Sequence, residues 1–333
     1  MDEFHKISST WTRAPILEVS RQVSPRRQST GYATVGTRLV SYTIQDFRAE
    51  AHQKEILAVI PAFNADRWIT QCLLSLSNNS EPHDVSIVDD GSDNPVSHIV
   101  LPMENLVIIR LFQNCGIVAA LNIAAIFSLE QGYKYYARQD ADDISYPERL
   151  RTQRSLSEAT GAILVTSLAR FVDEAGKTLW ISKDIIPPER VRNCLAKRNL
   201  YVHSSWFLRT TAFLLAGLYS REYQGAEDYE LLHRLCRAGH IVTADLPLID
   251  YLVHSASILS RNKTASRAQI RVQLRYFNFR RLSSYIGLLR SCSACLIPRS
   301  WKTRSRKLAQ RFLRLGLPPS ASPPFGNAES DDM

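Results

Sequence analysis

Between Glu55 and about Ala159, short apolar runs alternate with stretches in which apolar residues recur at helical spacing. The runs are continuously apolar, which is typical of parallel strands buried on both faces. We expect strands at 56–61, 85–90, 106–111 and 133–139, and helices at 66–77 and 117–130. Strands that alternate with helices of this length predict an α/β fold with a mostly parallel central sheet flanked by helices.

The pattern changes near Gly161. An antiparallel pair of strands is expected over 162–180, with its turn at 174–176. Further along, the same criteria predict helices at 188–198 and 225–240, and strands at 203–209 and 248–254. The second half of the domain is therefore expected to differ in architecture from the first.

Three polar clusters fall where predicted strands end, namely Phe63-Asn64, Asp89-Asp90 and Asp140 to Asp143. In sheets of this kind, ligands bind off the carboxyl ends of the strands. The positions of the clusters therefore predict that they share one binding site.

The most acidic cluster directly follows the 133–139 strand and contains Asp140, Asp142 and Asp143. Hard cations such as Mg²⁺ and Mn²⁺ take oxygen ligands, a few of them from protein and the rest from phosphate and water. Carboxylates spaced by one residue at a strand end suit this need. The alternative is a solvated acidic turn, but the position after an apolar strand favours a metal site.

Two further groups of interest lie later in the chain. Glu227-Asp228 opens the 225–240 helix, where acids stabilise the helix dipole by roughly 0.3–1 kcal/mol, so the pair taken alone is a helix-capping feature. A carboxylate is also the group needed to deprotonate an acceptor hydroxyl.

His254 ends the last predicted strand. A lone histidine is more often structural, although imidazole is a reasonable third metal ligand beside carboxylates.

Composition bounds the class of protein. With 333 residues, 45% of them hydrophobic and 22% charged, the chain has the makeup of a soluble globular protein. It contains no apolar run of about 18 residues and no apolar signal segment, so we expect a cytoplasmic protein without a transmembrane helix. Residues 1–54 are expected to form a loosely ordered extension, and 317–333, rich in Pro and Ser, a disordered tail.

The net charge of +9 is concentrated in residues 261–316, which carry 15 Lys and Arg and no Asp or Glu. The pattern there predicts helices over 271–290 and 301–316, the second with Trp301 and Phe312 on one face. Basic amphipathic helices suit the surface of an anionic bilayer, so we expect peripheral association with the inner face of the membrane through 261–316. A solvated or partner-binding helix is the alternative. Nucleic acid is not expected as a partner, because no nucleic-acid-binding motif accompanies the charge.

In this order, the clusters resemble those of the family 2 glycosyltransferases, inverting enzymes with the GT-A fold. The resemblance covers roughly 55–260 and is most specific at ARQDADDISYPERLRTQ (137–153). VIPAFNADRWITQCLLSL, VDDGSDNP and NCGIVAALNIA are similar to the family's earlier motifs, and AEDYELLHRL and YLVHSASILS to its later ones. Phe63, Asp93 and Leu252 depart from the residues that are usual there, which are Tyr, Thr and Arg.

On the donor side, the resemblance implies a nucleotide-binding half at about 55–145. The residues that it implies for donor binding are Pro61, Phe63, Asn64, Asp89 and Asn114, with Asp89 accepting a hydrogen bond from the base. Asp140 would contact ribose or sugar. Asp142 and His254 would ligate Mg²⁺ or Mn²⁺.

On the acceptor side, the resemblance implies a half-domain at about 146–260 in which Asp228 is the catalytic base and Glu227 shapes the acceptor site. The expected reaction is inverting transfer of a sugar, by single displacement, from a nucleotide-diphosphate donor to a hydroxyl of a glycan or lipid-linked acceptor. The expected donor is a UDP-sugar. This would be bacterial-type polysaccharide or glycoconjugate biosynthesis, and single addition is expected because the helices and the Gln-x-x-Arg-Trp motif of processive synthases are missing.

Two other functions were weighed. A catalytically silent nucleotide-sugar-binding or scaffold protein is disfavoured, because the acidic cluster and the candidate base are all present. A sugar nucleotidyltransferase would need a glycine-rich basic loop after the first strand, where this chain has Ala62 to Ala65.

Overall fold

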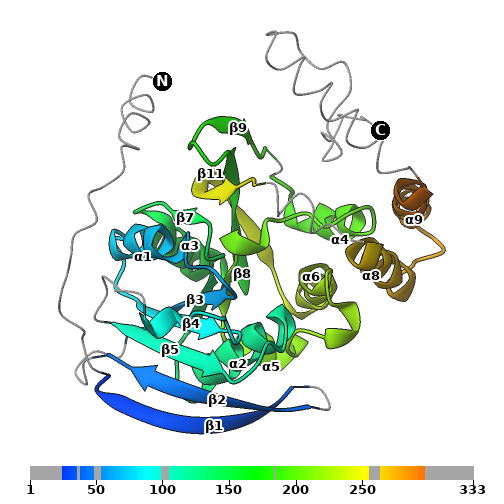
Figure 1. The fold of residues 1–333 in the computed structure, drawn as a ribbon. Helices are drawn as coiled ribbons and strands as arrows, with labels where there is room; N and C mark the ends of the chain where they lie inside the picture. The colour runs from blue at the N-terminus through cyan, green and yellow to red at the C-terminus, as the bar shows by residue number, and fades with distance from the viewer. Residues whose placement is uncertain are drawn as a thin grey trace.

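The computed structural model describes residues 25–35, 38–48, 54–98, 105–183, 185–254 and 263–296. Within these ranges eleven strands form one sheet (Figure 1). The strands are β1 (Arg27–Val35), β2 (Arg38–Asp46), β3 (Ile56–Ala62), β4 (Asp84–Asp89), β5 (Leu106–Leu111), β6 (Tyr135–Arg138), β7 (Ile144–Ser145), β8 (Leu164–Val172), β9 (Thr178–Ile181), β10 (Phe207–Arg209) and β11 (Ile241–Leu252). The α-helices are α1 (Ile69–Ser77), α2 (Ile117–Glu130), α3 (Arg149–Thr160), α4 (Pro188–Leu195), α5 (Thr211–Ala216), α6 (Glu227–Ala238), α8 (Lys263–Arg275) and α9 (Leu282–Leu296). Short 3₁₀ helices are η1 (Val96–His98), η2 (His203–Ser205) and η3 (Arg221–Tyr223).

The sheet is mixed. Its order is β1-β2-β5-β4-β3-β6-β10-β8-β11-β7, and β9 pairs with β8. The pairings from β5 through β4 and β3 to β6 are parallel, as expected for the first half of the domain. Outside this part the pairings are antiparallel except that of β8 with β11, so the sheet as a whole is mixed and the expected parallel arrangement is confirmed mainly in its central part.

Helices cover the central strands on both faces, as the continuous apolar runs predicted. Alternate residues of β3 point to opposite faces. Ala58 and Ile60 pack in one apolar cluster with residues of α1, and Leu57 and Val59 in another with residues of α2. The expected strands of this half appear as β3, β4, β5 and β6, within two residues of the expected bounds.

Residues 27–35 and 38–46, which we expected to be loosely ordered, instead form the antiparallel strands β1 and β2, here called the β1–β2 hairpin. β2 adds antiparallel to β5 and extends the sheet (Figure 1). Val40 is buried in the core, and Tyr42 and Ile44 pack against it. Their spacing of two residues is the signature of a strand with one buried face, and it explains why this segment is ordered.

The expected antiparallel pair of strands over 162–180 is confirmed: residues 164–172 form β8, and its end pairs antiparallel with β9 on the other side of the 174–176 turn. One other local expectation in the second half needs correction. The expected strand at 203–209 is a 3₁₀ turn, η2, followed by the short strand β10. β11 runs parallel to β8, and its far end pairs with β7, which follows the acidic loop directly.

The C-terminal helical region is present as α8 and α9, which pack against one another. The expected helix at 301–316 and the expected tail lie outside the described residues. In the part of the chain that the structure describes, every helix is too short or too polar to cross a membrane.

Candidate active site

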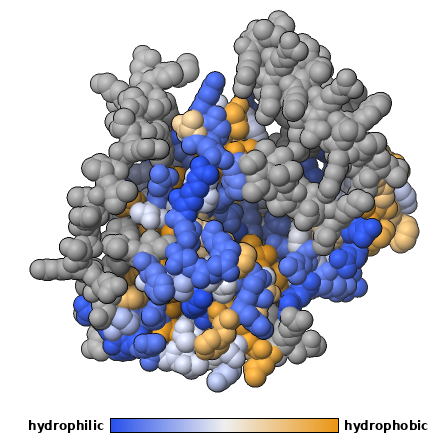
Figure 2. Space-filling view, in the orientation of Figure 1, coloured by the Kyte–Doolittle hydropathy of each residue, from blue (hydrophilic) through white to orange (hydrophobic). Residues whose placement is uncertain are grey.

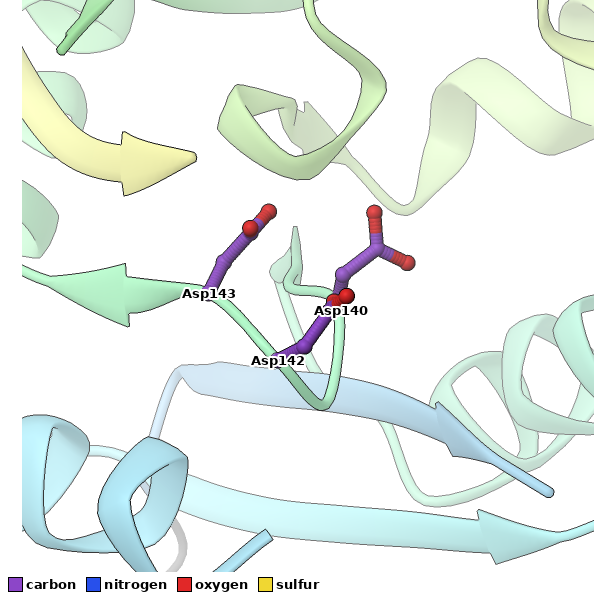
Figure 3. Close-up of side chains that lie close together, drawn as sticks. All are labelled: Asp140, Asp142 and Asp143. Atoms are coloured by element: carbon purple, nitrogen blue, oxygen red, sulfur yellow. The ribbon is translucent and has the colours of Figure 1, made fainter. Parts of the chain in front are cut away.

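The acidic loop between β6 and β7 brings three carboxylates together. Asp140, Asp142 and Asp143 each offer an oxygen, and these oxygens lie within 4.8 Å of one another. Figure 3 shows the three side chains projecting from this loop. The structure thus gathers the cluster that the sequence singled out, at the carboxyl end of a central strand.

Buried polar contacts hold the loop in place. The Arg149 side chain is fully buried and donates to Gln139 Oε1 (2.6 Å) and to the Arg138 carbonyl (2.7 Å). Gln139 Nε2 donates in turn to the Asp143 carbonyl (3.0 Å), and the Asp140 amide donates to Ser204 Oγ (2.9 Å). The carboxylates are therefore presented by a rigid loop.

Asp143 is the most buried member of the cluster. One of its oxygens accepts a hydrogen bond from the Leu252 amide (3.0 Å), and the other is buried with no hydrogen-bond partner among the described residues. Burial holds the pKa of Asp143 well above its usual range, and the charges of Asp140 and Asp142 add to the effect. Burial also raises the pKa of Asp142, again helped by the Asp140 charge. A buried, crowded set of carboxylates is unfavourable without a cation.

His254 lies at this cluster, because the pairing of β11 with β7 carries the end of β11 to the acidic loop. His254 Nε2 is 3.0 Å from Asp142 Oδ2, and its ring stacks on Trp68 with 6.1 Å between centroids. The two residues expected to ligate a metal are therefore in contact, although 112 positions separate them in sequence.

The loops after β3 and β4 form the neighbouring part of the site. The Asn64 amide donates to Ser92 Oγ (3.0 Å), and the side chain of Asn64 exchanges two hydrogen bonds with Asp93 (both 2.9 Å). Asn64 adopts a left-handed backbone with φ 50°, which asparagine tolerates better than most residues. Phe63 is exposed and Pro61 half-buried at this edge.

Asp89 is fully buried at the end of β4 and already has hydrogen-bond partners. One oxygen accepts from the Ser92 amide (2.9 Å), and the other from the Val96 amide (3.1 Å) and Arg110 Nη1 (2.5 Å). Both oxygens thus stabilise the turn after β4, and the expected contact of Asp89 with a base stays a prediction. Asp90 likewise accepts from the amides of Cys115 and Gly116.

The loop after β5 closes against this turn. At Gly91, where φ is 71°, an added Cβ would lie 2.6 Å from the Gln113 carbonyl carbon and 2.7 Å from the Asn114 nitrogen. Only glycine fits both the backbone conformation and this approach. The side chain of Asn114 is exposed at the surface beside it.

Glu227 and Asp228 form the first turn of α6. Asp228 accepts hydrogen bonds from Asn199 Nδ2 and from the Tyr229 amide (both 2.7 Å), and Glu227 accepts from the Gly225 amide (2.5 Å). Burial raises the pKa of both carboxyls, that of Glu227 to about 7 with help from the Asp228 charge. A helix dipole alone would lower these pKa values. Ionisation of this buried pair therefore costs free energy, which would not be the case for a simple helix cap.

Arg138, at the end of β6, is the residue that our reading of the sequence missed. Its side chain is buried, and Nη2 forms an ion pair with Asp140 Oδ1. Nε and Nη1 are buried without hydrogen-bond partners. The Arg138 charge also opposes the rise in the pKa of Glu227 and Asp228, so it acts on both acidic groups. An arginine near the end of the predicted strand YKYYARQ, two residues before Asp140, was the signal that could have identified it.

His203, the first residue of η2, has packing contacts. Its Nε2 lies 2.9 Å from the Tyr219 hydroxyl, and its ring meets Trp206 edge-on at 4.7 Å. Burial, with the Arg138 charge, holds the pKa of His203 well below its usual range, so the ring is neutral.

Comparisons with known proteins agree with this geometry. Residues 57–214 match the sequence model of the family described as "Glycosyl transferase family 2". The chain is 25% identical over 233 residues to an uncharacterized glycosyltransferase of Haemophilus influenzae, covering 64% of this chain and 71% of that protein. It is 27% identical over 239 residues to the amylovoran biosynthesis glycosyltransferase AmsE of Erwinia amylovora, covering 69% and 86%.

Solved structures support the fold. S. aureus TarS 1-349 in complex with UDP-GlcNAc is similar with a TM-score of 0.55 at 16% identity, covering 71% of this chain and 72% of that one. The mannosyltransferase PcManGT of Pyrobaculum calidifontis, in complex with GDP-Man and Mn2+, has a TM-score of 0.53 at 12% identity, covering 83% and 78%. The chain therefore has the GT-A fold, and its residues 57–214 carry the sequence pattern of the family 2 glycosyltransferases.

Proposed function

We propose that the protein is an inverting glycosyltransferase that moves a sugar from a UDP-sugar to a hydroxyl of a glycan or lipid-linked acceptor. The observation that carries this proposal is one buried arginine whose charge acts on two separate acidic groups. Asp140 of the acidic loop forms an ion pair with Arg138, whose charge also acts on Glu227 and Asp228. The acidic loop suits the binding of a charged donor, and the Glu227-Asp228 pair suits the removal of a proton from an acceptor.

The donor half would hold Mg²⁺ or Mn²⁺. Asp142 and His254 are the proposed ligands, and they are already in contact. The buried, unpartnered oxygen of Asp143 supports the fit, because such an oxygen calls for a positive partner. A bound cation would neutralise charge on the departing diphosphate. Asp140, which forms an ion pair with Arg138, would contact ribose or sugar.

The loops after β3, β4 and β5 would hold the nucleotide. The exposed ring of Phe63 offers a face for the base, beside Pro61, Asn64 and Asn114. Asp89 would contribute to nucleotide binding through the hydrogen bonds with which it holds the turn after β4. The complexes of TarS with UDP-GlcNAc and PcManGT with GDP-Man support a nucleotide sugar as the ligand class of this fold.

Asp228 is the proposed base. It would take the proton of the acceptor hydroxyl while the hydroxyl oxygen bonds to the anomeric carbon. The bond from that carbon to the diphosphate breaks on the opposite face, and its electron pair leaves with the diphosphate, so the configuration inverts. Burial raises the pKa of Asp228, which strengthens it as a base. Glu227 would shape the acceptor side of the same helix turn.

The test separates binding from transfer. UDP-sugars that stabilise the protein with Mn²⁺ are first found by thermal shift, and UDP release is then measured with a bacterial membrane extract as the acceptor source. Asp228→Asn should keep the thermal shift and lose UDP release, whereas Asp245→Asn, at an exposed position on β11, should keep both. Turnover retained in Asp228→Asn would exclude it as the base. Binding without release in the natural protein would instead favour a silent nucleotide-sugar-binding protein.

We also propose that the protein works at the inner face of a membrane, through the basic residues 261–316. These residues hold 15 Lys and Arg and no acid. A lipid-linked acceptor would be presented at that surface.

A further inference from the structure

The hairpin of α8 and α9 is held firmly on the glycosyltransferase domain. Tyr276, which follows α8, donates to Glu230 of α6 (2.7 Å) and stacks on His233 with 4.3 Å between ring centroids. At Gly287 of α9, an added Cβ would lie 2.1 Å from the Ala196 carbonyl oxygen, at the end of α4. These contacts fix which side of α9 faces the protein.

The inward side of α9 is small and polar. Ser283, Ser284 and Ser291 are buried, and Gly287 lies between them. Their hydroxyls are used: Ser283 Oγ donates to Asn193 (2.8 Å), Ser284 Oγ accepts from the Asn278 amide (3.2 Å), and Ser291 Oγ accepts from Gln269 (3.3 Å). The serines therefore specify this orientation of the helix.

The outward side of α9 is apolar. Leu282 and Leu289 are 74% and 70% exposed, and Tyr285 and Ile286 are also exposed. These four residues, here called the α9 face, recur at the i, i+3, i+4 and i+7 positions and so form one stripe. Figure 2 shows apolar side chains at the right margin of the molecule, where Figure 1 places α9. A surface helix normally has the reverse arrangement, with leucines inward and serines outward.

The charge around the α9 face indicates what covers it. Arg280 and Arg281 directly precede this face in sequence and Arg290 directly follows it; all three are exposed, and residues 263–296 contain no Asp or Glu. In a symmetric dimer through this face, like charges of the two copies would face one another. An anionic lipid surface offers apolar contact and negative charge together.

We propose that the α9 face is a membrane-docking surface whose leucines, with the neighbouring Phe279, enter the headgroup region of an anionic bilayer while the arginines contact lipid phosphates. Phe279 lies in the turn before α9, and its side chain is among the most exposed in the described residues. The proposal concerns membrane docking and holds whether or not the proposed transfer reaction is correct. It also locates the docking surface in α9 rather than in the residues beyond it.

The full-length protein is tested by flotation with two kinds of vesicle, one of phosphatidylcholine alone and one with about 30% phosphatidylglycerol. It should float with the anionic vesicles only, and less at high salt because salt screens the charge. Leu282→Ser/Leu289→Ser should reduce the partition coefficient at least tenfold. The matched control is Leu214→Ser/Leu215→Ser, which removes two equally exposed leucines (70% and 66%) of α5 and should change nothing.

A second variant guards against an effect on folding. Arg280→Glu/Arg281→Glu changes two exposed side chains and should also abolish flotation with anionic vesicles. The proposal is overturned if the leucine variant floats as well as the natural protein, or if the natural protein does not float. It is equally overturned if the natural protein is a dimer that the leucine variant converts to monomers without any change in vesicle binding.

Discussion

Replacing Glu227 with glutamine should make the protein more stable at neutral and alkaline pH. Glu227 is only 8% exposed, and its carboxyl has a pKa of about 7 instead of 4.5. A carboxyl whose pKa is raised in the folded state favours folding below its unfolded pKa, and this contribution is lost as pH rises through the folded value. Above pH 7 the folded protein therefore holds an unfavourable buried charge.

The size of the effect follows from the shift. A difference of about 2.5 pKa units at about 1.36 kcal/mol per unit gives about 3 kcal/mol at pH 8 and under about 1 kcal/mol at pH 5. Glutamine has the shape of the protonated acid and can still accept the hydrogen bond from the Gly225 amide. For a domain of 150–250 residues, about 3 kcal/mol corresponds to a rise in melting temperature of roughly 6–12 °C.

The assay is thermal unfolding of the natural protein and Glu227→Gln at pH 5 and pH 8, without nucleotide. The gap in melting temperature between the two proteins should open as pH rises. Glu230→Gln is the matched control, three residues along the same helix. Glu230 is buried against Arg234 (2.6 Å) and Tyr276 (2.7 Å), so its loss should destabilise the protein at both pH values by about 1–3 kcal/mol. A gap for Glu227→Gln that is equal at both pH values would refute the electrostatic argument.

Three other outcomes are expected. Asp142→Ala should abolish the Mn²⁺-dependent part of UDP binding in calorimetry, and unchanged affinity would remove Asp142 from the metal site. Arg138→Met should move the acid limb of the kcat–pH profile to higher pH, because the positive charge of Arg138 favours the ionised carboxylates of the acid pair and its loss raises their pKa. Arg138→Lys, which keeps a positive charge, should move the limb less. An unmoved limb in both variants would exclude this role of Arg138. Gly91→Ala should lower the melting temperature by the equivalent of about 1–3 kcal/mol, and Gly132→Ala by less. Both glycines have positive φ, but only at Gly91 would an added Cβ lie against other atoms. Equal losses of stability in the two variants would refute the steric argument.

The sequence predicted the central half of the fold well, because each element there carries its own signal. β3 to β6 are short and mostly apolar runs, and the helices between them show regular apolar spacing. The acidic loop was also predictable, since it directly follows the last of these strands. The β1–β2 hairpin was missed because its alternation is short and lies among polar residues; its burial depends on β5, about 65 positions further on in the chain.

The electrostatics of the site were not predictable in the same way. Asp89 and Asp228 are both aspartates in recognisable motifs, but only the structure shows that the first is fully paired inside a turn. The link from Arg138 to the acid pair joins residues about 90 positions apart. Burial decides these pKa values, and burial comes from how distant segments pack.

The C-terminal region shows why a periodic pattern does not reveal which face of a helix is buried. The composition of 261–316 predicted a basic membrane-binding segment, and the clearest amphipathic pattern was at 301–316, outside the described residues. In α9 the leucines and the serines recur with the same period, so the usual rule would turn the leucines inward. The hydrogen bonds of Ser283 and Ser291 and the close approach at Gly287 favour the opposite orientation. A helix that buries its serines against its own protein leaves its apolar stripe for another surface, and the arginines beside that stripe make an anionic bilayer the surface that fits.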